Sequence, residues 1–114
     1  MTTIYKICPA KEWRTAEQAG RFEGMAVDRR DGFIHFSIAS QVAETAARHF
    51  AGQADLFLIA ADANRLGPQL RWEPSRGGAL FPHLYGDLRV DAVEWVKPLP
   101  LDATGAHVFP EHLP

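Results

Sequence analysis

The sequence predicts a single α+β domain with a mixed or antiparallel sheet and two main helices. Five or six short segments have strand-like patterns, two segments have helical spacing, and the two kinds do not alternate strictly along the chain. Strict alternation would instead indicate a doubly wound parallel sheet. At 114 residues the chain has the length of one domain. We expect residues 1–98 to form this domain, and residues 99–114 to form an extended tail packed on or near it.

The N-terminal segment predicts a strand followed by a helix. Residues 3–8 alternate in polarity as a half-buried strand does. Pro9 suits the first position of a helix, because the N–H that it lacks would be unpaired there in any case. Trp13 and Ala16 have helical spacing, and Gly20 is expected to cap the C-terminal end of this helix.

A turn, a strand and the second helix are predicted next. Residues 28–32 (DRRDG) predict a turn, since Asp-Gly readily supplies the positive φ of tight turns. Residues 33–37 (FIHFS) predict a strand. Ser40 is expected to cap a helix over residues 41–51, which has one apolar stripe.

Short strands dominate the prediction for the second half of the chain. The apolar run at residues 56–61 is typical of a central strand buried on both faces. Residues 70–73 and 90–96 also predict strands. Between them, residues 74–82 (PSRGGALFP) contain two prolines and a glycine pair and predict a mobile or ligand-facing loop. Residues 83–86 predict a short strand or turn.

Composition and charge argue against several classes of protein. Twelve basic and fourteen acidic residues give no electrostatic footprint for nucleic acid. No stretch of 18 apolar residues occurs that would predict a membrane span. The N-terminal residues lack a basic region followed by an apolar one, so we expect no signal peptide and a cytoplasmic location. The single cysteine, Cys8, excludes an intrachain disulfide and is expected to be a buried thiol.

The first group of candidate site residues lies on the strand predicted at residues 33–37. Phe33, His35 and Ser37 share one face of such a strand, because successive side chains point to opposite faces. We therefore expect His35 and Ser37 to face a common polar region. The alternative is a core histidine bonded to backbone, with Ser37 opening the next turn.

The second group surrounds the predicted glycine-rich loop. Glu73, at the end of a strand, is a candidate general base or hydroxyl anchor. Trp72, Phe81 and Tyr85 are candidates for stacking on a planar ring, and Arg76 with the glycine pair could donate to a phosphate. Each has a structural alternative, such as a core position for Trp72 or a salt bridge for Glu73.

Several motifs resemble one known family. Residues 4–7 (IYKI), 32–37 (GFIHFS), 72–73 (WE) and 81–86 (FPHLYG) resemble the bacterial and plant family called domain of unknown function 952. The likeness extends over about residues 3–96. The fold of that family resembles the ADP-ribosyltransferase fold, a split mixed sheet that grips NAD in a cleft.

The resemblance implies a cleft that binds NAD or another nucleotide containing ADP-ribose. An enzyme of this kind transfers ADP-ribose or cleaves the glycosidic bond of NAD, through an oxocarbenium-like transition state that is stabilised electrostatically. His35 and His83 would hold the ribose or the phosphates, and Glu73 would polarise a hydroxyl. The predicted catalytic residues are Glu73 and His35, and the predicted ligand-binding residues are Tyr5, Lys6, Ser37, Trp72, Arg76, His83 and Tyr85.

Two other functions stay open at this point. A ligand-sensing or partner-binding module without catalysis is favoured by the last predicted strand, which lacks an acidic E-x-E pair and carries Glu94 as its one glutamate. Two histidines and a carboxylate are common metal ligands, so His35, Glu73 and His83 also permit a metal-dependent hydrolase. None of these three has a short metal-ligand spacing, and we expect no bound metal.

Overall fold

The structure, a computed structural model, describes residues 2–113, and the strands in these residues form three antiparallel sheets. This confirms the predicted α+β class, with the antiparallel form of the sheet. In their order within each sheet, the strands are β1 (Thr3–Pro9), β4 (Leu56–Asp62) and β8 (Val93–Pro98); β3 (Ile34–His35), β6 (Leu80–Leu84) and β5 (Leu70–Pro74); and β2 (Arg21–Phe22) and β7 (Leu88–Arg89).

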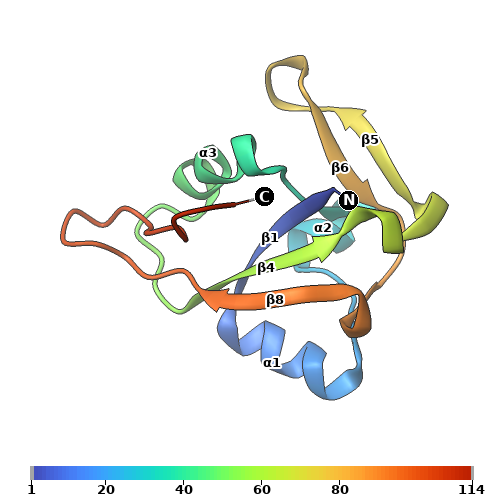
Figure 1. Ribbon diagram of the computed structural model, residues 1–114, viewed down its shortest axis with the longest axis horizontal. Helices are drawn as coiled ribbons and strands as arrows, with labels where there is room; N and C mark the ends of the chain where they lie inside the picture. The colour runs from blue at the N-terminus through green and yellow to red at the C-terminus, as the bar shows by residue number, and fades with distance from the viewer. Residues whose placement is uncertain (1, 114) are drawn as a thin grey trace.

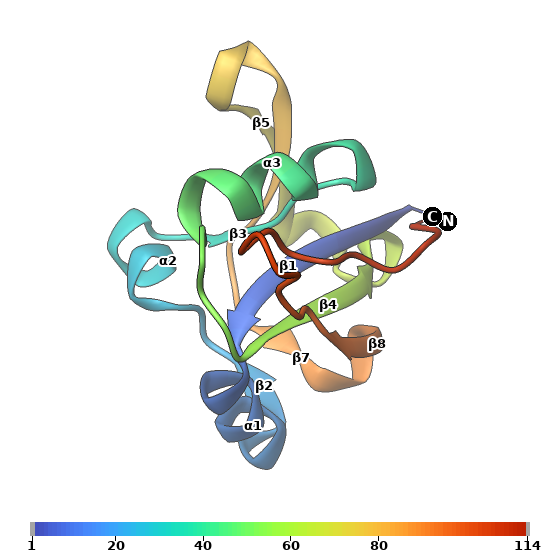
Figure 2. The ribbon, with the colours of Figure 1, turned by 90° about the vertical axis from the view of Figure 1, so that its left-hand side faces the viewer.

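The two longer helices cover opposite faces of the first sheet (Figures 1 and 2). The helices in the described residues are α1 (Ala10–Ala19), α2 (Ala26–Asp31), α3 (Ala39–His49) and the short 3-10 helices η1 (Ala63–Arg65), η2 (Gly67–Gln69), η3 (Arg76–Gly78) and η4 (Val90–Ala92). Trp13 and Ala16 of α1 pack into one apolar cluster, and Val42 and Ala46 of α3 pack into another. No helix in this part of the chain is both long and apolar enough to cross a membrane.

Strand β4 lies at the centre of the sheet, as its apolar run predicts. Leu58, Ile59, Ala60 and Ala61 are fully buried. Ile59 and Ala61 belong to the cluster on the α1 side, while Leu58 and Ala60 belong to the cluster on the α3 side. The prediction of a strand buried on both faces is therefore confirmed.

The turn predicted at residues 28–32 is wrong, because most of these residues lie in helix α2. The carboxylate of Asp28 accepts a hydrogen bond of 2.7 Å from the backbone N–H of Met25, which pairs a donor at the start of the helix. Gly32 ends the helix with a φ of 87°. The Asp-Gly pair thus closes a helix here, a role that glycine at positive φ fills as readily as it fills a tight turn.

Other boundaries move by a few residues. Pro9 ends β1 and precedes helix α1, and does not begin the helix. Ser40 is a helical residue, because the cap of α3 is Ile38, whose N–H donates to Oε1 of Gln41 at 3.1 Å. The side chain of Gln41 thus pairs the N–H of the cap residue itself, whereas Ser40 was expected to accept from an N–H further along the helix.

The predicted loop at residues 74–82 is largely a β-hairpin. Strand β5 continues to Pro74 and β6 begins at Leu80, with the short helix η3 between them. The hairpin stands away from the body of the molecule beside α3 (Figures 1 and 2). Gln41 of α3 donates to the backbone oxygen of Leu80 at 2.8 Å and so ties the hairpin to the helix.

Residues 99–113 return along the α3 side of the first sheet. Leu99 is buried, and Phe109 and Leu113 pack against the apolar cluster that contains Val42. Figure 1 shows this segment leaving the end of β8 and folding back toward α3 and β1.

Candidate functional site

A pocket of about 530 Å³ lies where β1, α2, β3, α3 and the β5–β6 hairpin meet. Its volume falls within the range of small-molecule sites. Two backbone hydrogen bonds, between Tyr5 and Ser37, join β1 to the segment after β3 beside the pocket. The predicted site residues that line it are Tyr5, Lys6, His35, Ser37, Arg76 and His83.

The buried carboxylate of Asp28 organises one wall of this pocket. Nζ of Lys6 lies 3.0 Å from Oδ1 and 2.9 Å from Oδ2 of Asp28. Nδ1 of His35 lies 2.6 Å from Oδ1, and the backbone N–H of His35 donates to the same oxygen at 3.1 Å. Asp28 thus joins α2, β1 and β3 through hydrogen bonds to one carboxylate.

Burial and hydrogen bonding act in opposite directions on Asp28. Its side chain is 1% exposed and that of Lys6 is 5% exposed. Burial alone would raise the pKa of Asp28, but the hydrogen bond from His35 and the charge of Lys6 outweigh it and lower the pKa to about 2. Asp28 is therefore ionised at neutral pH, and Nδ1 of His35 must donate to it.

His35 has a second carboxylate on its other nitrogen. Nε2 of His35 lies 3.0 Å from Oδ2 of Asp31, the last residue of α2. A hydrogen bond from Arg30 is the main cause that lowers the pKa of Asp31. His35 is thus held between the carboxylates of Asp28 and Asp31. His35, Arg30 and Asp31 all line the pocket.

His83 is held by a different carboxylate, on the hairpin. Nδ1 of His83 lies 2.9 Å from Oε1 of Glu73, and the hydroxyl of Tyr85 donates to the same oxygen at 2.7 Å. The hydrogen bonds from Tyr85 and then His83 lower the pKa of Glu73. The bond to Glu73 raises the pKa of Tyr85. Glu73 is thus an ionised acceptor for both groups.

Phe33 packs the aromatic groups of the site together. Its ring stacks on His83 with centroids 4.1 Å apart and lies 4.7 Å from His35 and 5.2 Å from Tyr85. His35 and His83 are register partners on β3 and β6, with ring centroids 5.6 Å apart. Phe33 and His35 are in contact, but β3 covers only Ile34–His35, so the strand predicted over residues 33–37 is shorter than expected.

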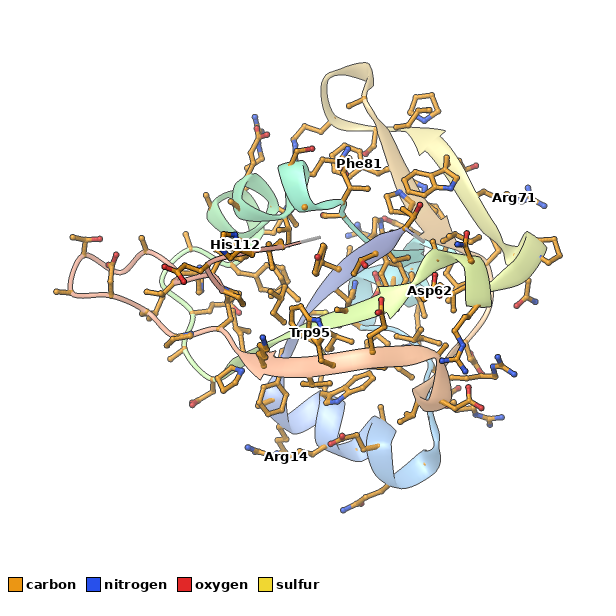
Figure 3. The ribbon with its side chains drawn as sticks, in the orientation of Figure 1. Arg14, Asp62, Arg71, Phe81, Trp95 and His112 are labelled. Carbon is orange, nitrogen blue, oxygen red and sulfur yellow. The ribbon has the colours of Figure 1, made fainter. Side chains whose placement is uncertain are left out.

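Arg76 and Ser37 meet α3 on the other side of the pocket. The hydroxyls of Ser37 and Thr45 lie 2.9 Å apart, and Nη2 of Arg76 donates to the Thr45 hydroxyl at 3.4 Å. The guanidinium carbon of Arg76 lies 4.9 Å above the ring of Phe81. Figure 3 shows Phe81 on β6 facing the start of α3.

Three of the predicted site residues do not line the pocket. Glu73 and Tyr85 stand behind His83, and their catalytic and ligand-binding roles stay predictions. The side chain of Trp72 is on the opposite face of β5 and is 41% exposed. Arg71, whose guanidinium lies 4.9 Å from the ring centroid of Tyr85, points outward from the hairpin (Figure 3).

Sequence reasoning missed Asp28 as a site residue. The segment DRRDG has the composition of an exposed turn, and nothing in it marks one aspartate as buried. The available signal was local: Asp28 stands three residues after Met25, the spacing at which an acidic side chain pairs the N–H of a helix cap. Arg30, Asp31 and Thr45 were missed as well.

The described residues hold neither a preformed metal site nor a reactive thiol. In residues 2–113 no set of three or more His, Cys, Asp and Glu side chains is arranged to hold a metal ion, so the metal-dependent alternative stays an untested prediction. Cys8 is buried, and burial raises the pKa of its thiol to about 12. It is a structural thiol, since the reactive form is the thiolate.

Comparison with known proteins identifies the family and the fold. The family described as Protein of unknown function (DUF952) matches residues 7–96. The crystal structure of protein CC0527 from Caulobacter crescentus is similar, with 54% identity, a TM-score of 0.91 and 94% of each chain covered. The solution NMR structure of CC0527 has 56% identity and a TM-score of 0.84, covering 93% of this chain and 91% of that one. No curated protein matches the chain.

Gly24 provides a test of how tightly Asp28 is seated. Gly24 has a φ of 100°, and a Cβ there would lie 2.8 Å from Cβ of Asp28, whereas a Cβ at Gly20 (φ 83°) would meet nothing within 4 Å. We expect Gly24→Ala to lower the free energy of unfolding by roughly 2–4 kcal/mol, and Gly20→Ala by about 1 kcal/mol. Denaturant titration measures both. Equal losses of stability in the two variants would show that Asp28 can shift to make room for the added methyl group.

Asp28 also predicts a pH dependence of stability. Its pKa is about 2 in the folded protein against an ordinary value of 3.8. Its stabilising contribution is therefore complete above pH 4 and is lost as the pH falls toward 2, about 2 kcal/mol in all.

Chemical unfolding of wild type and Asp28→Asn between pH 4.5 and pH 2 checks this. The free energy of unfolding of Asp28→Asn should not show the fall toward pH 2 that is due to Asp28. Glu111→Gln, which removes an exposed carboxylate, should keep it. The same slope in Asp28→Asn and wild type would contradict the assignment.

Proposed function

This chain belongs to the DUF952 family, a name that specifies no activity, and we propose that its pocket binds NAD or another nucleotide containing ADP-ribose. The observation that carries the proposal is the pocket lining, in which two guanidinium groups and aromatic walls occur together. Such a pocket suits a ligand that has both phosphates and planar rings. The proposal includes an ADP-ribosyltransferase-like fold, and the Tyr5–Ser37 bridge beside the pocket, which ties β1 to the segment that follows β3, supports it.

Arg76 is the residue best placed to bind a phosphate. Its side chain is 20% exposed, and Phe81 and Thr45 fix its position before any ligand arrives. Its contact with Glu44 is long, 3.7 Å, and Glu44 is 56% exposed, so a phosphate would compete with a weak partner. A guanidinium makes paired hydrogen bonds to phosphate oxygens. Arg30 supplies a second guanidinium from α2.

The apolar part of the lining suits a planar ring. Phe36, Phe50 and Phe81 all line the pocket, and Tyr5 joins them from β1. Aromatic walls favour flat heterocycles through their area and through offset stacking. The adenine or nicotinamide ring would occupy this part.

A non-catalytic ligand-sensing module is the second candidate, and one observation favours it. Oε1 of Glu73, the predicted catalytic carboxylate, already accepts from both His83 and Tyr85, and Glu73 does not line the pocket. If the protein is an enzyme, it transfers ADP-ribose or cleaves the glycosidic bond of NAD. Consumption of bound NAD separates an enzyme from a sensor.

The cytoplasmic location stays a prediction.

Calorimetry with NAD, ADP-ribose and nicotinamide tests the proposal. We expect binding of NAD or ADP-ribose, weakened roughly 10- to 100-fold by Arg76→Gln, because a charge-assisted pair with phosphate is lost. Arg89→Gln is the matched control: Arg89 is exposed on β7, away from the pocket, and its loss should change affinity less than twofold. Absence of heat at millimolar ligand would overturn the proposal.

A further inference from the structure

We infer that His83 is the hydrogen-bond acceptor of this pocket: Glu73 holds its Nδ1 proton, and the lone pair of Nε2 faces the ligand. His83 therefore selects a ligand group that donates a hydrogen bond, such as a hydroxyl, and Glu73 is a positioning residue. The identity of the donor, a ribose hydroxyl of ADP-ribose, rests on the proposed function. The state of the imidazole does not.

The first step concerns Nδ1 of His83. Glu73 is an ionised carboxylate, because two hydrogen bonds lower its pKa. An ionised carboxylate only accepts hydrogen bonds. The contact of 2.9 Å between Nδ1 and Oε1 therefore places a proton on Nδ1.

The second step concerns Nε2 of the same ring. In residues 2–113 no hydrogen-bond partner of this atom is found. His83 as a whole is only 5% exposed. Among the described residues, however, Nε1 of Trp13 is the one side-chain nitrogen or oxygen that is both fully buried and without a partner, so Nε2 of His83 is not fully buried. Nε2 of His83 is therefore reached by solvent, and His83 lines the pocket. In a neutral imidazole that carries its proton on Nδ1, Nε2 is an acceptor.

The third step is that the ring cannot easily turn to exchange its nitrogens. Phe33 stacks on it with an interplanar angle of 24°, and His35 meets it edge-on from the neighbouring strand. Tyr85 holds Glu73 from the far side. Rotation of His83 would break the contact with Glu73 inside a packed aromatic group, so the direction of Nε2 is fixed.

The fourth step is the contrast with His35. Both nitrogens of His35 face carboxylates, Asp28 and Asp31, whereas His83 has one carboxylate and one open nitrogen. Phosphate oxygens at neutral pH carry lone pairs and would face the lone pair of Nε2 unfavourably. Phosphates are therefore expected at Arg76, and a hydroxyl at His83.

The protonation state of His83 can be measured without any ligand. Nitrogen-15 NMR of the imidazole at pH 7.5 should show a proton on Nδ1 and none on Nε2. In Glu73→Ala the proton should move to Nε2, the tautomer that free histidine favours in water. Tyr85→Phe, the matched control, keeps the acceptor and should keep the wild-type tautomer. A proton on Nε2 in the wild type, alone or with one on Nδ1, would overturn the inference.

The selection of a hydroxyl is measured with two probes, ADP and ADP-ribose. The preference for ADP-ribose over ADP, measured as the ratio of their affinities, should fall roughly tenfold in His83→Phe, because the acceptor for the terminal ribose is lost. In Arg89→Gln the ratio should stay at the wild-type value. An unchanged ratio in His83→Phe would overturn the assigned donor. If neither probe binds the wild type, the proposed function fails, while the NMR result still decides the state of His83.

Discussion

The carboxylate of Asp28 is the interaction on which the site depends most. It is almost fully buried, and it pairs Lys6 of β1, His35 of β3 and the backbone N–H of Met25 at the start of α2. Removing one member of such a buried pair leaves an uncompensated charge, which costs about 3–5 kcal/mol. Because these partners come from three different elements, one side chain holds together both the wall of the pocket and the helix beside it.

Local patterns in the sequence predicted the elements whose structure is decided locally. The apolar run of β4 and the alternation of residues 33–37 led to a buried central strand and to the shared face of Phe33 and His35. The helix-cap spacing of Asp28 was a local signal, but its burial could not be predicted because it depends on Lys6, a partner 22 positions away. The register that brings Glu73 to His83 was hidden by the prolines of residues 74–82, which suggested a loop where β6 begins.

The two histidines show how one residue type acquires two different hydrogen-bonding environments. His35 and His83 are register partners of similar chemistry, and Phe33 contacts both. What differs is the number of carboxylates around each ring and their position. In the described residues the pocket therefore has one imidazole with carboxylates at both nitrogens and one with a carboxylate at Nδ1 alone.

The bridge between Tyr5 and Ser37 consists of main-chain atoms alone, with N···O distances of 2.8 and 2.9 Å. Such main-chain bonds can form with any residue except proline at the two positions, because proline lacks the N–H. The spacing of the two sheets at this point is thus insulated from substitution of the residues that line the hollow between them. A substitution at Tyr5 or Ser37 would therefore change the lining of the pocket and leave this main-chain connection in place.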